Sequence, residues 1–192
     1  MSCLLALLAA GCLEAPPDTE PAPLCGTTRV LADEFEAESE EWYRYGSTEL
    51  AAGRVLLYAA PGSSSGMSST WEYQLAGSEL TMQIRRVDVA DDGELAMALV
   101  NREDDAAGLL LAGGNLSLFQ AVGESYIAPY SVPFAPDALW WRLGEAGGEL
   151  SWSTSTDGST WIDQGSLPLE LVDPVVAEID LRAASTQVVV EI

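Results

Sequence analysis

The chain of 192 residues contains no lysine and no histidine, and its eight basic residues, all arginine, stand against 30 acidic ones for a net charge of −22. Without histidine there is no imidazole base, no Ser-His-Asp or Cys-His nucleophile system and no His-ligated zinc; without lysine there is no Schiff base. Carboxylates are the groups that remain for acid–base chemistry. Such an acidic surface repels phosphate groups, and we therefore exclude nucleic acid as a partner. Cations are the small partners that this charge favours.

The sequence also lacks an apolar run of the about 20 residues that a membrane-spanning helix needs. Residues 1–11 form a shorter apolar stretch that ends in small residues directly before Cys12, as in a signal peptide. This segment resembles a bacterial lipoprotein signal. The resemblance implies that residues 1–11 are removed and that Cys12 carries the lipid, which would be the only attachment of the chain to a membrane.

The segment after Cys12 favours a location in the bacterial cell envelope. Leu13 stands where an Asp would mark retention in the inner membrane, so the same resemblance implies the outer membrane rather than the inner one, with the domain in the periplasm or outside the cell. Residues 12–28 are rich in Pro and acids and have no apolar period, which predicts a tether. Cys25 then has no internal disulfide partner; it is a free thiol, an intermolecular bridge or a passive residue.

Residues 29–192 predict an all-β domain. Short runs with period two are separated by Gly, Ser, Asp and Asn clusters, and Leu80, Met82 and Ile84 alternate with polar neighbours as a half-buried strand requires. The predicted strands are Arg54–Ala59, Ser69–Gln74, Glu79–Val87, Leu95–Val100, Gly108–Ala112, Leu116–Val122, Tyr126–Val132, Leu139–Leu143, Glu149–Ser155, Thr160–Gly165, Val175–Leu181 and Gln187–Ile192.

The stretch from Trp140 to Trp161 gives the clearest sign of an antiparallel sandwich. Gly147-Gly148 and Asp157-Gly158 are two turn signals that divide it into three strands. We expect Trp152, Trp161 and one of the adjacent pair Trp140 and Trp141 to pack in or beneath this hairpin. The strand at the end of the chain is expected to pair with an early one.

Four features together resemble the concanavalin A-like lectin/glucanase superfamily, and among its members the laminin G-like modules most closely. They are Asp33-Glu34-Phe35, the loop from there to Trp42, the run Trp140-Trp141-Arg142-Leu143, and the motif Ser155-Thr156-Asp157-Gly158-Ser159-Thr160-Trp161. The resemblance covers residues 32–192. It implies a jelly roll of two antiparallel sheets, sugar binding on a concave sheet and, in many members, a structural calcium ion.

Two sets of residues are candidates for ligand binding. Trp71, Tyr73, Tyr126 and Tyr130 could stack on sugar rings, although each could instead belong to the core. Asp33, Glu34 and Asp180 could bind a calcium ion if the terminal strands pair, with Asp91–Glu94 and Glu103–Asp105 as alternative loop sites. For each acidic cluster a solvated turn is the simpler interpretation.

The resemblance also raises the question of catalysis. Laminarinase-like glucanases of the superfamily carry two acids in the pattern Glu-x-Asp-x-x-Glu on one strand, and here Glu178 and Asp180 begin the pattern while Ala183 stands where the second acid would fall. The strand is also the penultimate one in the sequence, which argues against a central position. We therefore predict a non-catalytic envelope lipoprotein that binds glycan or an envelope protein. Two alternatives stay open: a structural or adhesive lipoprotein without a small ligand, and a glycoside hydrolase.

Overall fold

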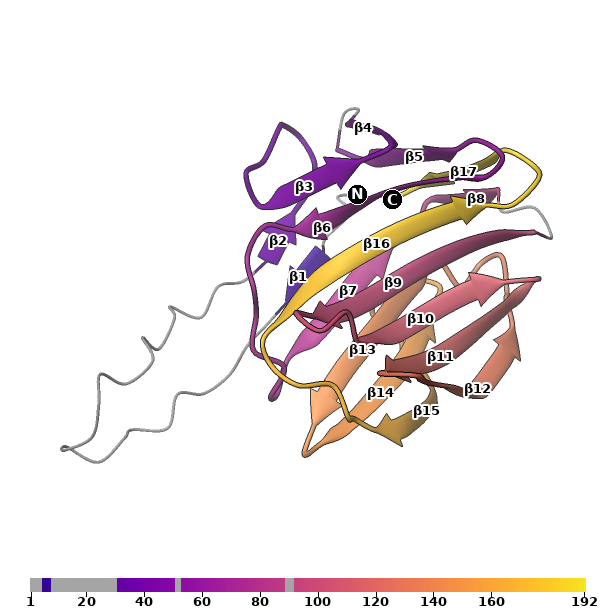
Figure 1. Cartoon of the computed structure of the whole chain (residues 1–192). Helices are drawn as coiled ribbons and strands as arrows, with labels where there is room; N and C mark the ends of the chain where they lie inside the picture. Colours follow the sequence, from indigo (N-terminus) through magenta and orange to yellow (C-terminus); the bar gives the residue numbers. More distant parts are fainter. Residues whose placement is uncertain (1–4, 8–30, 51–52, 89–91) are drawn as a thin grey trace.

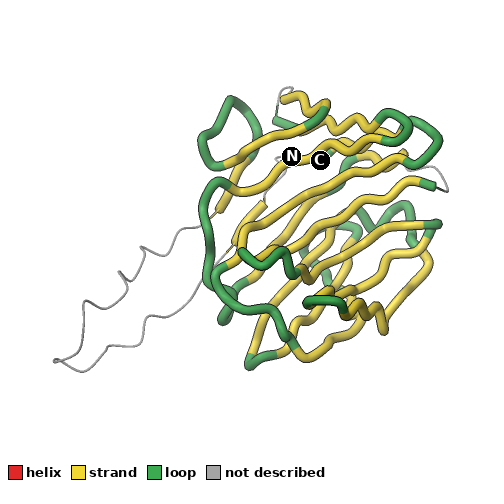
Figure 2. The backbone as a smooth tube through the Cα atoms, in the orientation of Figure 1, coloured by secondary structure: helices red, strands yellow, loops and turns green. Residues whose placement is uncertain are grey.

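The computed structural model describes residues 5–7, 31–50, 53–88 and 92–192 (Figures 1 and 2). Over these ranges the chain forms strands, turns and loops. Among the described residues there is no helix of the length and apolar character that crossing a membrane demands. Cys12, Cys25 and the predicted tether lie outside the described residues, as does most of the predicted leader.

One sheet has seven antiparallel strands, which lie across the front of Figure 1 in the spatial order β12-β11-β10-β9-β16-β6-β3. β16, although late in the sequence, lies between β9 and β6 in the middle of the sheet. The expectation that the penultimate strand is not a central one is therefore wrong. The strands are β3 (Trp42–Tyr45), β6 (Ser63–Ser69), β9 (Gly93–Asn101), β10 (Ala106–Ala112), β11 (Asn115–Val122), β12 (Ser125–Pro133) and β16 (Val175–Ala183).

Two further sheets complete the fold. A six-stranded sheet has the order β15-β14-β13-β7-β1-β2, with β1 (Leu5–Leu7), β2 (Leu31–Asp33), β7 (Glu79–Gln83), β13 (Trp140–Ala146), β14 (Glu149–Ser155) and β15 (Ile162–Pro168). A four-stranded sheet has the order β4-β5-β17-β8, with β4 (Ser47–Leu50), β5 (Val55–Ala59), β8 (Arg86–Asp88) and β17 (Val188–Glu191). The last strand, β17, pairs with the early strand β5, as predicted.

A single apolar core joins the three sheets. It contains Leu80 and Met82 from the six-stranded sheet, Met97 and Ile179 from the seven-stranded one and Val190 from the four-stranded one. Alternate residues of each strand point into this core, because successive side chains of a strand point to opposite faces. The prediction of an all-β antiparallel sandwich is confirmed.

The strand prediction is wrong in two places: the predicted strand Glu79–Val87 is divided into β7 and β8 of different sheets, and the polar segment before Trp71 is misplaced. The sequence predicts a strand over Ser69–Gln74, but the strand is Ser63–Ser69, and residues 70–78 form a loop. In β6 the inward positions are Ser65, Met67 and Ser69, so two of its three core-facing side chains are small and polar. A serine-rich strand carries little hydrophobic alternation, and its neighbours β16 and β3 supply the pairing that the sequence pattern does not show.

Strand β1 falls within the predicted leader. It lies between β2 and β7 and pairs with both. Removal of residues 1–11 stays a prediction, and it would take β1 out of the six-stranded sheet.

Candidate functional site

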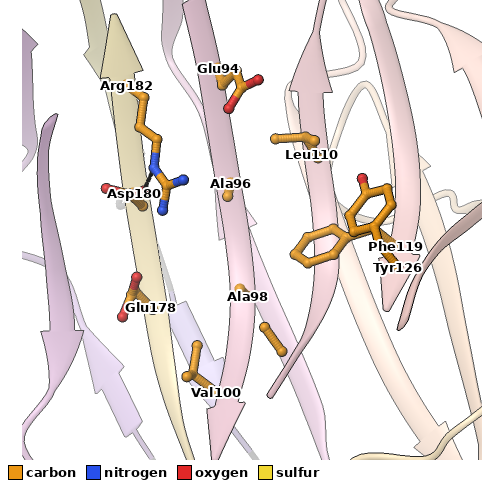
Figure 3. A pocket seen from close by; sticks show the side chains of 11 residues that line it. Glu94, Ala96, Ala98, Val100, Leu110, Phe119, Tyr126, Glu178, Asp180 and Arg182 are labelled. Atoms are coloured by element: carbon orange, nitrogen blue, oxygen red, sulfur yellow. Dashed lines mark hydrogen bonds and ion pairs between the residues drawn. The ribbon is translucent and has the colours of Figure 1, made fainter. Parts of the chain in front are cut away.

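The outer face of the seven-stranded sheet is hollowed into a groove of about 350 Å³ (Figure 3). Its lining comes from Glu94, Ala96, Ala98, Val100, Ala106, Leu110, Phe119, Tyr126, Glu178, Asp180 and Arg182. These residues lie on β9, β10, β11, β12 and β16, at positions that alternate with core residues such as Met97 and Ile179. The groove is therefore built on the regular alternation of the strands and not on loops.

Small side chains on the two middle strands form the floor of the groove. Ala96 and Ala98 come from β9, and Ala106 comes from β10. Gly108 faces the same side because it is the ladder partner of Ala98, and a Cβ there would lie 2.2 Å from the Met97 carbonyl oxygen. Larger residues at these positions would fill the space that the groove now leaves open.

One wall of the groove is polar and centres on Asp180 of β16. The residue is 6% exposed, and the Tyr45 hydroxyl donates a hydrogen bond to its Oδ1 at 3.0 Å. Arg182 Nε donates to the other carboxylate oxygen, Oδ2. Each of the two Asp180 carboxylate oxygens therefore has its own hydrogen-bond donor.

Gly66 of β6 makes the contact between Tyr45 and Asp180 geometrically feasible. It is the ladder partner of both residues, on β3 and β16. A Cβ at Gly66 would lie 2.5 Å from the Tyr45 hydroxyl oxygen and 2.7 Å from its Cζ. The phenol ring thus crosses β6 in the space that the missing side chain leaves.

Glu178 is the second carboxyl group of the polar wall. It lies two residues before Asp180 on the same face, and its Oε1 is 3.5 Å from the Tyr45 hydroxyl oxygen. Burial, and then the nearby negative charge of Asp180, raise the pKa of Glu178. Burial also raises the pKa of Tyr45, with the two carboxylates adding to the effect. The groove therefore places two carboxyl groups on one strand, and one of them, Glu178, holds its proton more strongly than usual.

The opposite wall is aromatic. The rings of Phe119 and Tyr126 stack with their centroids 6.0 Å apart and 18° between their planes. Tyr126 is 58% exposed, whereas Phe119 is buried beneath it. Of the four predicted stacking residues, the structure places Tyr126 on the groove.

The other three predicted stacking residues lie elsewhere. Tyr73 is 4% exposed and belongs to the core, so its prediction as a sugar platform is wrong. Tyr130 pairs with the core-facing residue Leu118, and its ring leans over Gly165 of the six-stranded sheet. Trp71 is exposed but lies in the loop over residues 70–78, outside the lining of the groove.

The predicted calcium site does not form. Asp33 lies on β2 of the six-stranded sheet with Glu34 directly after it, whereas Asp180 lies in the groove of the seven-stranded sheet. Asp33 Oδ1 instead accepts a hydrogen bond from the Phe35 backbone at 2.7 Å. Within the described ranges no group of three or more Cys, Asp or Glu side chains is arranged to hold a metal ion.

Two acids of the alternative loop sites, Asp92 and Asp105, have backbone partners, whereas Asp91 lies outside the described residues. Asp105 Oδ1 accepts from the Gly123 N–H at 2.7 Å, and Asp92 Oδ2 accepts from the Ser185 N–H at 2.8 Å. Both carboxylates therefore stabilise the local backbone through these hydrogen bonds. The residues that the structure describes therefore do not form a site for the structural calcium ion that the resemblance implies.

The geometry of β16 decides how the incomplete catalytic pattern is to be interpreted. β16 pairs with β9 from Val175 to Ala183 and with β6 from Glu178 to Ala183, and neither register contains a bulge. Ala183 is buried on the core side, with Leu181. The next position that faces the groove after Asp180 is therefore residue 182, and it is occupied by an arginine.

Sequence reasoning misses Tyr45, Phe119 and Glu94 as residues of this face. A signal for Phe119 exists, because it is a large apolar residue that alternates with Leu116 and Leu118 and so has to point away from the core. Tyr45 gives a weaker signal, since its contact with Asp180 depends on a strand that is distant in the sequence.

Neither the comparison with protein families nor that with curated proteins finds a match to this sequence. Solved structures with a similar fold do exist. A prokaryotic β-1,3-1,4-glucanase (lichenase) from a mouse hindgut metagenome is 10% identical over 83% of this chain and 94% of its own, with a TM-score of 0.64.

Two further structures are similar to about the same extent. The exoplasmic/lumenal domain of VIP36 in its Ca²⁺/Man3GlcNAc-bound form is 11% identical, covers 79% of this chain and 83% of its own, and has a TM-score of 0.62. The legume lectin-like domain from Entamoeba histolytica is 13% identical, with coverages of 78% and 86% and a TM-score of 0.59. The protein thus has the concanavalin A-like jelly-roll fold, as the sequence predicts.

Proposed function

We propose that this protein is a non-catalytic carbohydrate-binding lipoprotein of the bacterial envelope and that the groove on its seven-stranded sheet holds the glycan. The observation that carries the proposal is the composition of the groove. An aromatic wall with an exposed ring, Tyr126, faces a wall of hydrogen-bonding groups across a floor of alanines. A sugar ring offers apolar C–H faces to an aromatic ring and hydroxyl groups to carboxylates.

The neighbouring structures support a carbohydrate as the ligand. One is a legume lectin-like domain, one was solved with bound Man3GlcNAc, and a third is a glucanase. Fold alone does not determine function, so the proposal rests on the groove.

The absence of catalysis is proposed because the acids of the groove are not arranged as an independent pair. A glycosidase uses one carboxyl group as acid and a second as nucleophile or base. Here Asp180 is bound on one oxygen by Tyr45 and on the other by Arg182. Arg182 also occupies the next groove-facing position on β16, where a further acid would have to stand.

Glycan binding is tested with a variant that fills the floor of the groove with a larger side chain. In a titration of the purified full chain with β-1,3-1,4-glucan, β-1,3-glucan, chitin and mannan oligosaccharides, we expect at least one class to bind. The Ala98→Leu variant is then expected to lose more than tenfold in affinity, because leucine occupies the floor. The matched control, Ala135→Leu in an exposed loop, should bind as the parent does. Equal binding by both variants would contradict the proposed location.

A second candidate function, glycoside hydrolysis, is favoured by one specific observation. Glu178 has a raised pKa and lies on the same face as a second carboxyl group, that of Asp180, and two such carboxyl groups can serve as an acid and a base. Release of reducing ends from β-1,3-1,4-glucan by the parent but not by Glu178→Gln would establish it. We expect neither protein to release them.

The envelope location is tested separately. Mass spectrometry of the protein recovered from the membrane fraction of a bacterial host should show a chain that begins at a lipid-modified Cys12. An unmodified chain that retains residues 1–11 would contradict the lipoprotein assignment and would keep β1 in its sheet.

A further inference from the structure

Tyr43 is the most exposed large apolar side chain of the described residues, at 67%. It lies on β3, at the edge of the seven-stranded sheet farthest from Tyr126. The groove lining does not include it. Nothing in the fold itself therefore accounts for an aromatic ring at this position.

Strand alternation places Tyr43 on the same face as the groove. Its neighbour Trp42 points into the core. Tyr45, two residues further along β3, reaches Asp180 on the outer face. Since alternate residues of a strand share a face, Tyr43 also points outward, beside the polar wall.

The register of the sheet aligns Tyr43 with the aromatic wall across six strands. Successive ladder partners form one row on the outer face: Tyr43, Ser68, Glu178, Ala98, Gly108 and Phe119. Neighbouring strands are about 4.8 Å apart, so the five steps of this row span about 24 Å. The row thus has an aromatic ring at each end and a hydroxyl, a carboxyl group and the small floor residues between them.

We propose that Tyr43 is a second sugar-stacking residue and that the ligand is a linear, neutral glycan that lies across the strands. A hexose advances a chain by about 5 Å, so about five sugar rings match the span of about 24 Å set by the strand spacing. A uronate polymer is disfavoured because Glu178, Glu94 and Asp180 face this surface against one arginine, Arg182. This inference rests on the proposed function.

Chain length provides the test. Trimers and hexamers of β-1,3-1,4-glucan, chitin and mannan are titrated into the full-length parent and into Tyr43→Ala and Tyr126→Ala variants. Stacking on one ring is worth up to about 1.5 kcal/mol, or about tenfold in affinity. Tyr43→Ala should therefore lose about tenfold for the hexamer and nothing for the trimer, whereas Tyr126→Ala should weaken both.

Control variants separate the effect of losing the Tyr43 ring from the effect of a disturbed fold. Tyr43→Phe keeps the ring and should keep hexamer binding, and Ile162→Ala removes an exposed apolar side chain from the six-stranded sheet and should change neither affinity. Unchanged melting temperatures would show that all variants are folded.

The outcomes distinguish failure of the role of Tyr43 from failure of the proposed function. If the parent binds the hexamer and Tyr43→Ala binds it equally well, or loses trimer affinity to the same extent, the role of Tyr43 is wrong while the proposed function stands. If the parent binds no hexamer of any class, the proposed function fails and this inference fails with it.

Discussion

The outer faces of the two large sheets carry similar residues and use them differently. On the six-stranded sheet, the Arg142 guanidinium lies 4.2 Å from the centre of the Trp161 ring, its Nε donates to Ser153 Oγ at 2.9 Å, and Glu79 completes the cluster at 3.6 Å. Ser153 is buried beneath this arrangement. On the seven-stranded sheet, the aromatic and charged residues stand on opposite sides of an alanine floor. The two faces therefore differ in whether the middle of the sheet is left open, and not in the types of residue that they carry.

The largest difference between the faces is expected from glycine substitutions. Gly66→Ala places a Cβ 2.2 Å from the Ile179 carbonyl oxygen and against the Tyr45 ring, so we expect a loss of about 1–3 kcal/mol in unfolding free energy together with weaker glycan binding. Gly144→Ala is the matched control on the six-stranded sheet, where the nearest atom would be Ser151 Oγ at 3.5 Å. Chemical denaturation of both variants measures the contrast, and equal losses would contradict it.

Removal of one hydroxyl group tests the polar wall. Tyr45→Phe leaves Asp180 Oδ1 without its donor at 3.0 Å. A hydrogen bond to a charged group is worth about 1.5–3 kcal/mol, and we discount this because Tyr45 is only partly buried, so we expect a loss of about 1 kcal/mol. Denaturant titration measures it. No loss would show that the contact does not hold the wall together.

The two faces should differ in the sign of their pH dependence. Burial and Asp180 raise the pKa of Glu178, so its stabilising contribution is complete below its unfolded-state pKa and is lost as pH rises through the folded-state value. Glu178→Gln should therefore melt at a higher temperature than the parent at pH 8, with the gap narrowing towards pH 4. Thermal melts across this range would contradict the account if the gap were constant or reversed.

Asp157, in the hairpin beside the six-stranded sheet, is expected to behave in the opposite way. Backbone N–H groups of Thr160 and Ser159 donate to its carboxylate and lower its pKa. Its contribution is present above the unfolded-state pKa and is lost as pH falls. Asp157→Asn should be less stable than the parent at pH 7 and should approach it in acid, as the same melts would show.

The smallest effect on glycan binding is expected at the cluster of the six-stranded sheet. Arg142→Ala removes a cation–π contact and a partly exposed ion pair, so a loss of about 1 kcal/mol in stability is expected. Glycan affinity should stay unchanged, because this cluster lies on the six-stranded sheet and the groove lies on the seven-stranded one. The same oligosaccharide titration measures the affinity. A fall in the affinity of Arg142→Ala would indicate that the glycan binds the six-stranded sheet, which would contradict the proposed site.

The sequence predicts the sandwich well because its strands alternate clearly. Leu80, Met82 and Ile84 are buried as the period-two pattern requires, and Trp141 and Trp152 lie in the core below the predicted hairpin. The serine-rich strand β6 is missed because only one of its three core-facing residues, Met67, is apolar, and its pairing with β16 and β3 defines it.

The site is less predictable because it depends on register between distant strands. Glu178 and Tyr45 are far apart in sequence, and their meeting depends on Gly66, which carries no side-chain signal. Tyr73 and Tyr126 both lie in segments that the sequence predicts as strands, yet Tyr73 bridges to Val175 in the core and Tyr126 stacks on Phe119 at the groove. A single sequence does not show which tyrosine the sheet order leaves exposed.

One measurement tests the central claim directly: the mapping, by NMR chemical-shift changes, of the surface that responds when the glycan hexamer of highest affinity is added to the full chain. The account predicts that the changes gather on β16, β9 and β10 around Asp180, Ala96 and Gly108, and extend to Tyr43 on β3. Changes centred on Arg142 and Trp161, or no localised change at saturating hexamer, would contradict it.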